Sequence, residues 1–251
     1  MRDLTPTSSG PTSVKKAAIR LATRADAPEL QALYAYYVEQ TTVSFELEAP
    51  DVAEMERRIA AVEGVYPFFV CVVETDEREN SEDASSLRLQ TAGNAKNREK
   101  SAKNERIVGY ALAHRAFERA AYSWCAETTV YVDRDWRRRG VGEALYSALI
   151  KTLEAQGVRS LYAVVVAENK ASVEFHRRAG YREFATFKNS GWKFGRWLDV
   201  VWLERTLGVW SDDGRKKGSA DAAPTPVRPV AELGADWTME ICDVAARKLT
   251  F

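Results

Sequence analysis

The chain of 251 residues has little cysteine, no net charge and no long apolar run. Its cysteines, Cys71, Cys125 and Cys242, are widely separated and match neither a disulfide framework nor a zinc-site spacing, which favours a reducing compartment. Lysine plus arginine equal aspartate plus glutamate at 36 each, so the chain offers no broad cationic face to nucleic acid or lipid. No apolar run reaches the length of a membrane span. We therefore expect a cytoplasmic protein with neither a membrane nor a nucleic acid as partner.

Three polar stretches lack the apolar periodicity that is typical of helices and strands. Residues 1–17 are rich in serine and threonine without the apolar core of a signal peptide, so we expect a disordered tail, with an organelle-targeting segment as the alternative. Residues 77–104 mix both charge signs with few large aliphatic side chains, which predicts a disordered insert. A low-complexity C-terminal extension is expected at residues 208–251, of which the last part, 236–251, could dock back. One domain of residues 18–207 remains.

Within this domain, segments with a strand pattern alternate with segments with a helix pattern. Strands expected at residues 67–74 and 106–115 flank the polar insert, which is then an overgrown hairpin turn. Leu145, Leu149 and Leu153 recur at helical spacing ahead of a glycine, a residue that commonly ends helices. The alternation predicts an α/β (α+β) layer domain.

A turn with three arginines and two glycines follows one of the predicted strands and precedes a helix. A helix N-terminus leaves N–H groups unpaired and carries partial positive charge. Gly140 and Gly142 let an anion approach these groups without a Cβ in the way, and Arg137, Arg138 and Arg139 add positive charge. The turn predicts a phosphate or pyrophosphate site, with an arginine-rich surface turn as the alternative.

Two common glycine loops do not fit this turn. A Walker loop needs Lys and then Ser or Thr after its second glycine, but Gly142 is followed by Glu143 and Ala144. A dinucleotide fingerprint needs a third glycine or alanine where this chain has Leu145. The remaining pattern, Arg-x-x-Gly-x-Gly over residues 137–142, resembles the pyrophosphate loop of the GCN5-related N-acetyltransferases (GNAT), which bind acetyl-coenzyme A.

Further blocks resemble the phosphinothricin and methionine sulfoximine N-acetyltransferase branch of that superfamily. They follow the family's order: TTVSFELE (41–48), AETTVYV (126–132), LEAQG (153–157), FHRRAGY (175–181) and WKFGRWLDVVW (192–202). The resemblance covers nearly all of the domain, but neither the insert nor the extension. It implies the GNAT fold, a mixed and mostly antiparallel central sheet flanked by helices, and acetyl-CoA as co-substrate without a metal.

The resemblance implies two catalytic residues. Glu127 matches the general base of the family, and its apolar strand would desolvate the carboxylate and raise its pKa, although ion pairs also explain such glutamates. His176 stands where many members carry a tyrosine that protonates the coenzyme thiolate, and a histidine of near-neutral pKa could supply that proton. A packed or exposed helix histidine is the alternative for His176.

The resemblance also implies binding residues for both substrates. For acetyl-CoA they are Val130, Tyr131, Val132, Arg137, Arg138, Arg139, Gly140, Val141, Gly142 and Asn169, the last also explained as a helix N-cap. For the amino acid they are Phe45 as an aromatic wall and Arg119 with Tyr122 around its acidic group, because an arginine fork pairs with a carboxylate or phosphinate. Phe117 replaces a lysine of some herbicide-detoxifying relatives, which favours a methionine-sulfoximine-like or unknown amino acid.

From these residues we expect an acetyl-CoA-dependent N-acetyltransferase that acetylates a small amino acid or amino-acid analogue by direct attack. Its partner is then a small-molecule substrate, and by analogy with the branch the chain forms a homodimer. A non-catalytic acetyl-CoA-binding module that recruits partners through its insert and tail is the alternative. A nucleic-acid binder built on Trp136 and the arginines is disfavoured by the zero net charge.

Overall fold

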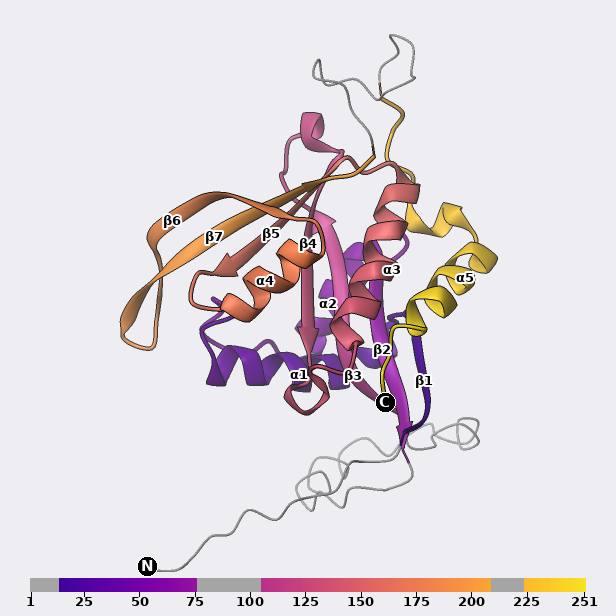
Figure 1. The fold of residues 1–251 in the computed structure, drawn as a ribbon, viewed down its shortest axis with the longest axis horizontal. Helices are drawn as coiled ribbons and strands as arrows, with labels where there is room; N and C mark the ends of the chain where they lie inside the picture. Colours follow the sequence, from indigo (N-terminus) through magenta and orange to yellow (C-terminus); the bar gives the residue numbers. More distant parts are fainter. Residues whose placement is uncertain (1–13, 76–104, 209–223) are drawn as a thin grey trace, which may run out of the picture.

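The computed structural model describes residues 14–75, 105–208 and 224–251 of the chain. These residues form one seven-stranded sheet that carries helices on both of its faces (Figure 1). The insert expected at 77–104 lies outside the described residues, as do most of the expected N-terminal tail and the first part of the expected extension.

The sheet is mixed and mostly antiparallel, which confirms the predicted fold. In spatial order its strands are β1 (Val14–Leu21), β2 (Phe68–Thr75), β3 (Glu105–Arg115), β4 (Cys125–Val132), β5 (Ser160–Val166), β7 (Arg196–Thr206) and β6 (Arg182–Lys193). Neighbouring strands are antiparallel except β4 and β5, which are parallel. A parallel pair needs a crossover connection, and a helix between β4 and β5 provides it.

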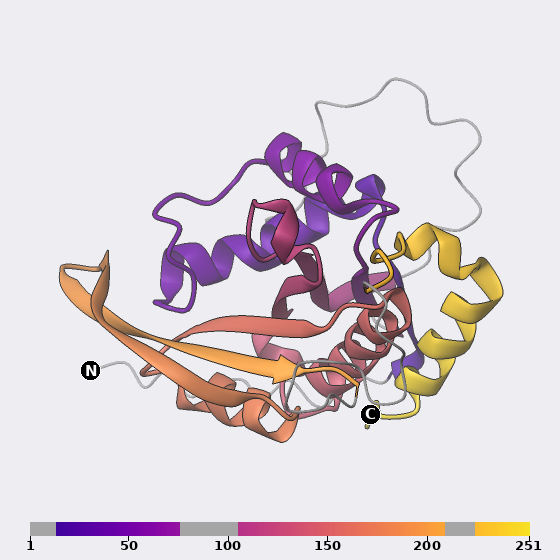
Figure 2. The same cartoon turned by 90° about the horizontal axis from the view of Figure 1, so that it is seen from above.

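Helices form a layer on each side of the sheet (Figure 2). One layer holds α1 (Ala27–Gln40) and α2 (Val52–Val62); the other holds the crossover helix α3 (Val141–Gln156), α4 (Lys170–Arg178) and α5 (Ala235–Ala246). Short 3-10 helices stand in the connections: η1 (Arg24–Asp26), η4 (Ala120–Tyr122), η5 (Arg134–Trp136) and η6 (Val230–Leu233). Each layer encloses its own hydrophobic core against the sheet.

The apolar spacing in α3 places its leucines in the core as predicted. Leu145, Leu149 and Leu153 are fully buried between α3 and the sheet. Gly157 then ends the helix with a φ of 93°, a left-handed conformation that side chains with a Cβ rarely adopt. At its other end α3 begins at Val141, directly after the arginine turn that follows β4.

Two borders of the domain differ from those expected. β1 begins at Val14 rather than at residue 18, because Val14 still pairs with Thr75 of β2. After the polar stretch that follows β7, the chain returns to the fold: α5 packs against α3 and β1, with Cys242 and Ala245 buried in the core under α3. The last part of the expected extension is therefore built into the domain. This agrees with the expectation that residues 236–251 could dock back, since the apolar residues that dock come after the low-complexity stretch.

Two negative findings apply to the described ranges 14–75, 105–208 and 224–251. None of their helices combines the length and the apolar character that a membrane crossing needs. No group of three or more His, Cys, Asp and Glu side chains in these ranges is arranged to hold a metal ion. The cysteines Cys71, Cys125 and Cys242 are free thiols.

Candidate active site

A cleft opens where the parallel strands β4 and β5 part. The two strands pair only from Cys125 to Glu127 of β4, whereas β4 stays paired with β3 as far as Val132. The hydroxyl of Thr128 makes the last link between them, because it donates to the carbonyl oxygen of Tyr162 on β5 (3.0 Å). Beyond this link, one edge of β4 faces the cleft instead of another strand.

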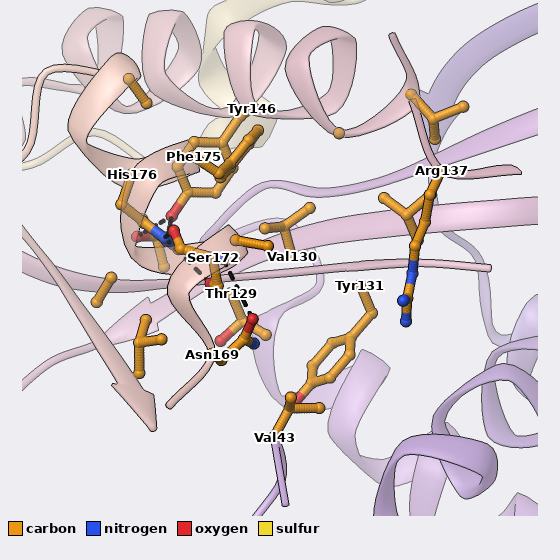
Figure 3. A pocket seen from close by; sticks show the side chains of 18 of the residues that line it. Val43, Thr129, Val130, Tyr131, Arg137, Tyr146, Asn169, Ser172, Phe175 and His176 are labelled. Carbon is orange, nitrogen blue, oxygen red and sulfur yellow. Dashed lines mark hydrogen bonds between the residues drawn. The ribbon is translucent and has the colours of Figure 1, made fainter. Parts of the chain in front are cut away.

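The cleft has a volume of about 2080 Å³ and brings together most of the site residues predicted from the sequence. Those that line it are Phe45, Glu127, Val130, Tyr131, Val132, Arg137, Arg138, Arg139, Gly140, Val141, Gly142, Asn169 and His176. In Figure 3, His176 lies toward one end of the cleft with Tyr146 and Ser172, while Arg137 lies toward the other. The parting of the strands therefore gathers residues from the loop after α1, from β4, from the start of α3 and from α4.

Arg119 and Tyr122 do not line this cleft. They line a separate hollow of about 380 Å³ together with Phe117. The two hollows are neighbours, because the ring of Tyr162 lies 5.5 Å from that of Phe117 while its backbone pairs with Glu127. The expected clamp for the acidic group of the substrate is thus close to the cleft but outside it in a single chain.

The arginine turn contains two left-handed residues. Arg138 has a φ of 61° and Gly140 a φ of 75°. The left-handed conformation costs a residue with a Cβ about 1–2 kcal/mol, and such strain is concentrated at functional sites. Arg137 holds the turn against α1, because its guanidinium donates to the hydroxyl of Tyr37 (3.0 Å).

The start of α3 presents unpaired backbone donors at this turn. The first backbone hydrogen bond of the helix runs from the N–H of Ala144 to the oxygen of Gly140 (2.9 Å). The N–H groups of Val141, Gly142 and Glu143 therefore have no acceptor within the helix. Amide donors, the partial positive charge of a helix N-terminus and nearby guanidinium groups are the chemistry that suits a diphosphate.

Glu127 lies at the point where the strands part. Its side chain is half-buried, so the desolvation expected from its apolar neighbours is incomplete. Because side chains alternate along a strand, Glu127 shares a face of the sheet with Thr129 and Tyr131, toward α1. Among the described residues its carboxylate has neither a hydrogen bond nor an ion pair, so the ion-pair alternative does not explain it. The carboxylate is available to a molecule in the cleft.

His176 is enclosed, with 3% of its surface exposed, and both ring nitrogens have partners. Nδ1 lies 2.8 Å from the carbonyl oxygen of Ser172, which can only accept, so Nδ1 carries the proton. In the neutral ring Nε2 then accepts from the hydroxyl of Tyr146 (2.9 Å). Burial lowers the pKa of His176, which keeps the imidazole neutral at pH 7. His176 therefore has no free N–H to offer directly to a thiolate.

A buried chain of hydroxyls continues from His176 to the head of the cleft. Thr128 Oγ1 lies 2.8 Å from the hydroxyl of Tyr146 and 2.8 Å from that of Tyr181. Burial raises the pKa of both tyrosines, so they too stay neutral. No local sequence pattern indicates these three residues as a group, because Thr128 lies on β4, Tyr146 on α3 and Tyr181 after α4. Only the packing of α3 and α4 against β4 brings them together.

The burial of His176 makes the stability of the fold depend on pH. Below an unfolded-state pKa of about 6.5, the unfolded chain binds a proton that the buried imidazole resists. The free energy of unfolding should therefore fall as the pH drops below about 6.5, by up to about 1.4 kcal/mol per pH unit. Urea denaturation at pH values from about 7.5 down to about 5.5 measures this slope.

The slope should be smaller in His176→Gln. His114→Gln is the matched control, because it removes the other histidine of the chain and should keep the slope of the unmodified protein. Equal slopes in the unmodified protein and in His176→Gln would contradict the assignment of this pH dependence to His176.

A buried lysine, Lys193, holds the loop after α1, which forms one side of the cleft. Lys193 reaches from β6 to the end of α1, where its ammonium donates to the carbonyl oxygens of Val38 (2.6 Å) and Ser44 (2.7 Å). Ser44 also lies 2.8 Å from the hydroxyl of Tyr34. These contacts hold the loop that carries Phe45 at the cleft. No local sequence pattern indicates this role of Lys193, because its partners Val38 and Ser44 lie far from it in the chain.

Comparison with known proteins agrees with this geometry. Residues 74–202 match the family model described as "Acetyltransferase (GNAT) domain". A phosphinothricin N-acetyltransferase of Streptomyces viridochromogenes is 31% identical over 215 residues, which cover 86% of this chain and 95% of that protein. An L-methionine sulfoximine/L-methionine sulfone acetyltransferase of Pseudomonas aeruginosa is 37% identical over 103 residues, 40% of this chain and 59% of that protein.

A solved structure resembles the whole fold. The phosphinothricin acetyltransferase (Pat) from Sinorhizobium meliloti, crystallised in complex with AcCoA, matches with a TM-score of 0.64 and 28% sequence identity. The match covers 84% of this chain and 98% of that one. Together with the cleft at the parted strands, these findings define an enzyme that transfers an acetyl group from acetyl-CoA. The chain belongs to the GNAT family of N-acetyltransferases, which confirms the resemblance seen in its sequence.

Proposed function

We propose that this enzyme acetylates the amino group of a small amino acid or amino-acid analogue by direct attack in the cleft. The observation that carries the proposal is the place of Glu127, a carboxylate without a partner among the described residues, at the parting of β4 and β5. The same cleft contains the arginine turn. The relatives named as phosphinothricin and methionine sulfoximine acetyltransferases support an amino-acid-like amine.

Acetyl-CoA supplies a thioester whose carbonyl carbon bonds to the amine nitrogen while the bond to sulfur breaks. The arginine turn from Arg137 to Gly142 and the side chain of Asn169 would bind this co-substrate. The unpaired edge of β4 from Val130 to Val132 would hold the thioester carbonyl through backbone N–H groups. Asn169 also caps α4, because its oxygen accepts from the N–H of Ser172 (3.2 Å), which leaves its amide hydrogens for a ligand.

Glu127 acts as the general base. It takes a proton from the substrate ammonium, directly or through a water molecule, which frees the nitrogen lone pair for attack. The position supports this role, since a base must lie within reach of the proton that it takes and carry no competing partner.

For the proton that the departing thiolate takes up, we propose the hydroxyl of Tyr146, which lines the cleft, rather than the imidazole, because Nε2 of His176 carries no proton. Neither ring nitrogen of His176 is free, whereas the hydroxyl of Tyr146 stands between the imidazole and Thr128 of β4. Thr128 and Tyr181 extend the Tyr146–His176 pair into a chain of neutral groups. After it has given its proton to the thiolate, the hydroxyl of Tyr146 is restored, through water in the cleft, by the second proton that the substrate nitrogen loses when the amide forms.

The expected homodimer is also a proposal. Large apolar side chains are exposed on β5, on β6 and β7, and at the turn between them: Val164, Phe184, Phe187, Trp192, Phe194 and Trp197. Large apolar side chains exposed on neighbouring strands often mark an interface. A homodimer predicts that the molecular mass measured by light scattering is twice the mass of the chain.

A thiol-release assay tests the proposed function. The enzyme is incubated with acetyl-CoA and a panel of free amino acids that includes methionine sulfoximine, methionine sulfone and phosphinothricin, and free coenzyme thiol is measured. Release that depends on one class of amino acid, with the N-acetyl product seen by mass spectrometry, is the expected result. Tight binding of acetyl-CoA with no turnover on any amine would favour the non-catalytic module instead.

A further inference from the structure

The end of the chain lies across the arginine turn. The C-terminus ends beside the N-terminal end of α3 (Figure 1), and the N–H of Thr250 donates to the carbonyl oxygen of Arg139 (3.1 Å). The ring of Phe251 stacks edge-on against the buried Trp136, with centroids 5.6 Å apart. Because α5 is anchored in the core just before this segment, residues 248–251 have a defined position on the turn.

The fit between this segment and the turn is close. A Cβ placed on Gly140 would lie 2.0 Å from the carbonyl oxygen of Lys248, so only glycine lets the two backbones approach in this way. The matched part of the family model ends at residue 202. The contact between the C-terminal segment and the turn therefore comes from a part of the chain outside that model.

Lys248 brings a positive charge to the same cleft as the arginines. Its side chain lines the cleft, and its ammonium lies 2.9 Å from a carboxylate oxygen of Glu143 in the first turn of α3. Both partners are exposed, at 40% for Lys248 and 69% for Glu143, so the pair contributes little stability. The diphosphate and the 3′-phosphate of acetyl-CoA each carry about two negative charges and a carboxylate carries one, so either anion can draw the ammonium away from Glu143 at little cost.

We propose that Lys248 binds a phosphate of the acyl donor, so that the C-terminal segment completes the phosphate end of the site. This inference rests on the proposed function, because it needs acetyl-CoA in the cleft. The turn supplies guanidinium and amide donors from one side, and Lys248 supplies an ammonium from the segment that crosses it. The phosphate concerned is either the diphosphate or the 3′-phosphate of the coenzyme, since both are anions that an ammonium recognises.

Calorimetry with acetyl-CoA on Lys248→Met tests the proposal. Methionine keeps an unbranched apolar stem and removes the charge, so we expect the dissociation constant to rise about three- to tenfold. Arg247→Met is the matched control, because Arg247 is exposed next to Lys248 but does not line the cleft, and its dissociation constant should stay that of the unmodified chain. Equal dissociation constants in Lys248→Met and the unmodified chain would overturn the proposal.

A double variant tests whether Lys248 contacts a phosphate itself or only offsets the negative charge of Glu143. If Lys248 acts only by offsetting that carboxylate, then Glu143→Gln combined with Lys248→Met restores the affinity of the unmodified chain, which would refute direct binding. If Lys248 contacts a phosphate, the double variant stays weaker than Glu143→Gln alone by the same three- to tenfold factor, roughly.

Acetyl-dephospho-CoA, which lacks the 3′-phosphate, identifies the phosphate concerned. A loss of affinity in Lys248→Met that persists with this donor assigns Lys248 to the diphosphate, and a loss that disappears assigns it to the 3′-phosphate. If the unmodified chain does not bind acetyl-CoA, the proposed function is contradicted. If the unmodified chain and Lys248→Met bind it equally well, only the role of Lys248 is contradicted.

Discussion

Glu127→Gln is expected to lower the turnover number about 10²- to 10⁴-fold at neutral pH, the range typical of a lost general base. Glutamine keeps the size and a hydrogen-bonding oxygen of the side chain but cannot take up the ammonium proton. The dissociation constant for acetyl-CoA should stay nearly the same, because Glu127 lies at the parting of the strands and the arginine turn lies beyond the end of β4. Steady-state kinetics and calorimetry on the same preparation measure the two quantities.

The pH dependence of the turnover rate of Glu127→Gln provides a second test. Because an unprotonated amine needs no base, the rate deficit of Glu127→Gln should shrink as the pH approaches the pKa of the substrate ammonium. Glu154→Gln, an equivalent change on the exposed side of α3, is the control and should leave the kinetics unchanged. Unimpaired turnover in Glu127→Gln at neutral pH would remove Glu127 from the role of base.

Gly140→Ala is expected to damage the phosphate end of the site through two separate effects. The residue has a left-handed φ of 75°, which costs alanine about 1–2 kcal/mol. Its new Cβ would also lie 2.0 Å from the carbonyl oxygen of Lys248, so the turn or the C-terminal segment must move. We expect a fall in the free energy of unfolding larger than the left-handed cost alone, and affinity for acetyl-CoA about tenfold weaker.

Gly195→Ala separates the two effects. Gly195 has a similar φ of 73°, but a Cβ there meets no atom within 4 Å, so alanine at this position has the backbone cost without the overlap. Urea denaturation of both variants should show the larger loss of stability in Gly140→Ala. Equal losses of stability in the two variants would contradict the close contact between Gly140 and the carbonyl oxygen of Lys248.

Several features could be predicted from the sequence because they depend on local chemistry. Residue type and spacing predict the turn from Arg137 to Gly142. Helical periodicity predicts the buried leucines of α3. The hairpin of β2 and β3 could be predicted across a long polar insert, because each strand carries its own apolar pattern. In each case a short stretch of chain contains all of the relevant information.

Other features of the site escaped prediction because they depend on contacts between distant segments. The pairing of His176 with Tyr146 arises from the packing of α4 on α3, and it changes the chemistry expected of the histidine. Arg119 was expected to hold the acidic group of the substrate, yet the loop after β3 places it in a hollow next to the cleft. Docking of residues 236–251 was considered from the sequence, but only the structure shows that α5 brings Lys248 to the arginine turn.

The sequence by itself determined the family, the elements of the fold and the kind of ligand that the turn would accept, because residue type and short-range spacing govern helices, strands and glycine turns. Only the tertiary structure decided which side chains share the cleft, which have free protons or free carboxylates, and where the chain ends. Those properties depend on burial and on distances between elements. Both arise only when the sheet closes against its two layers of helices.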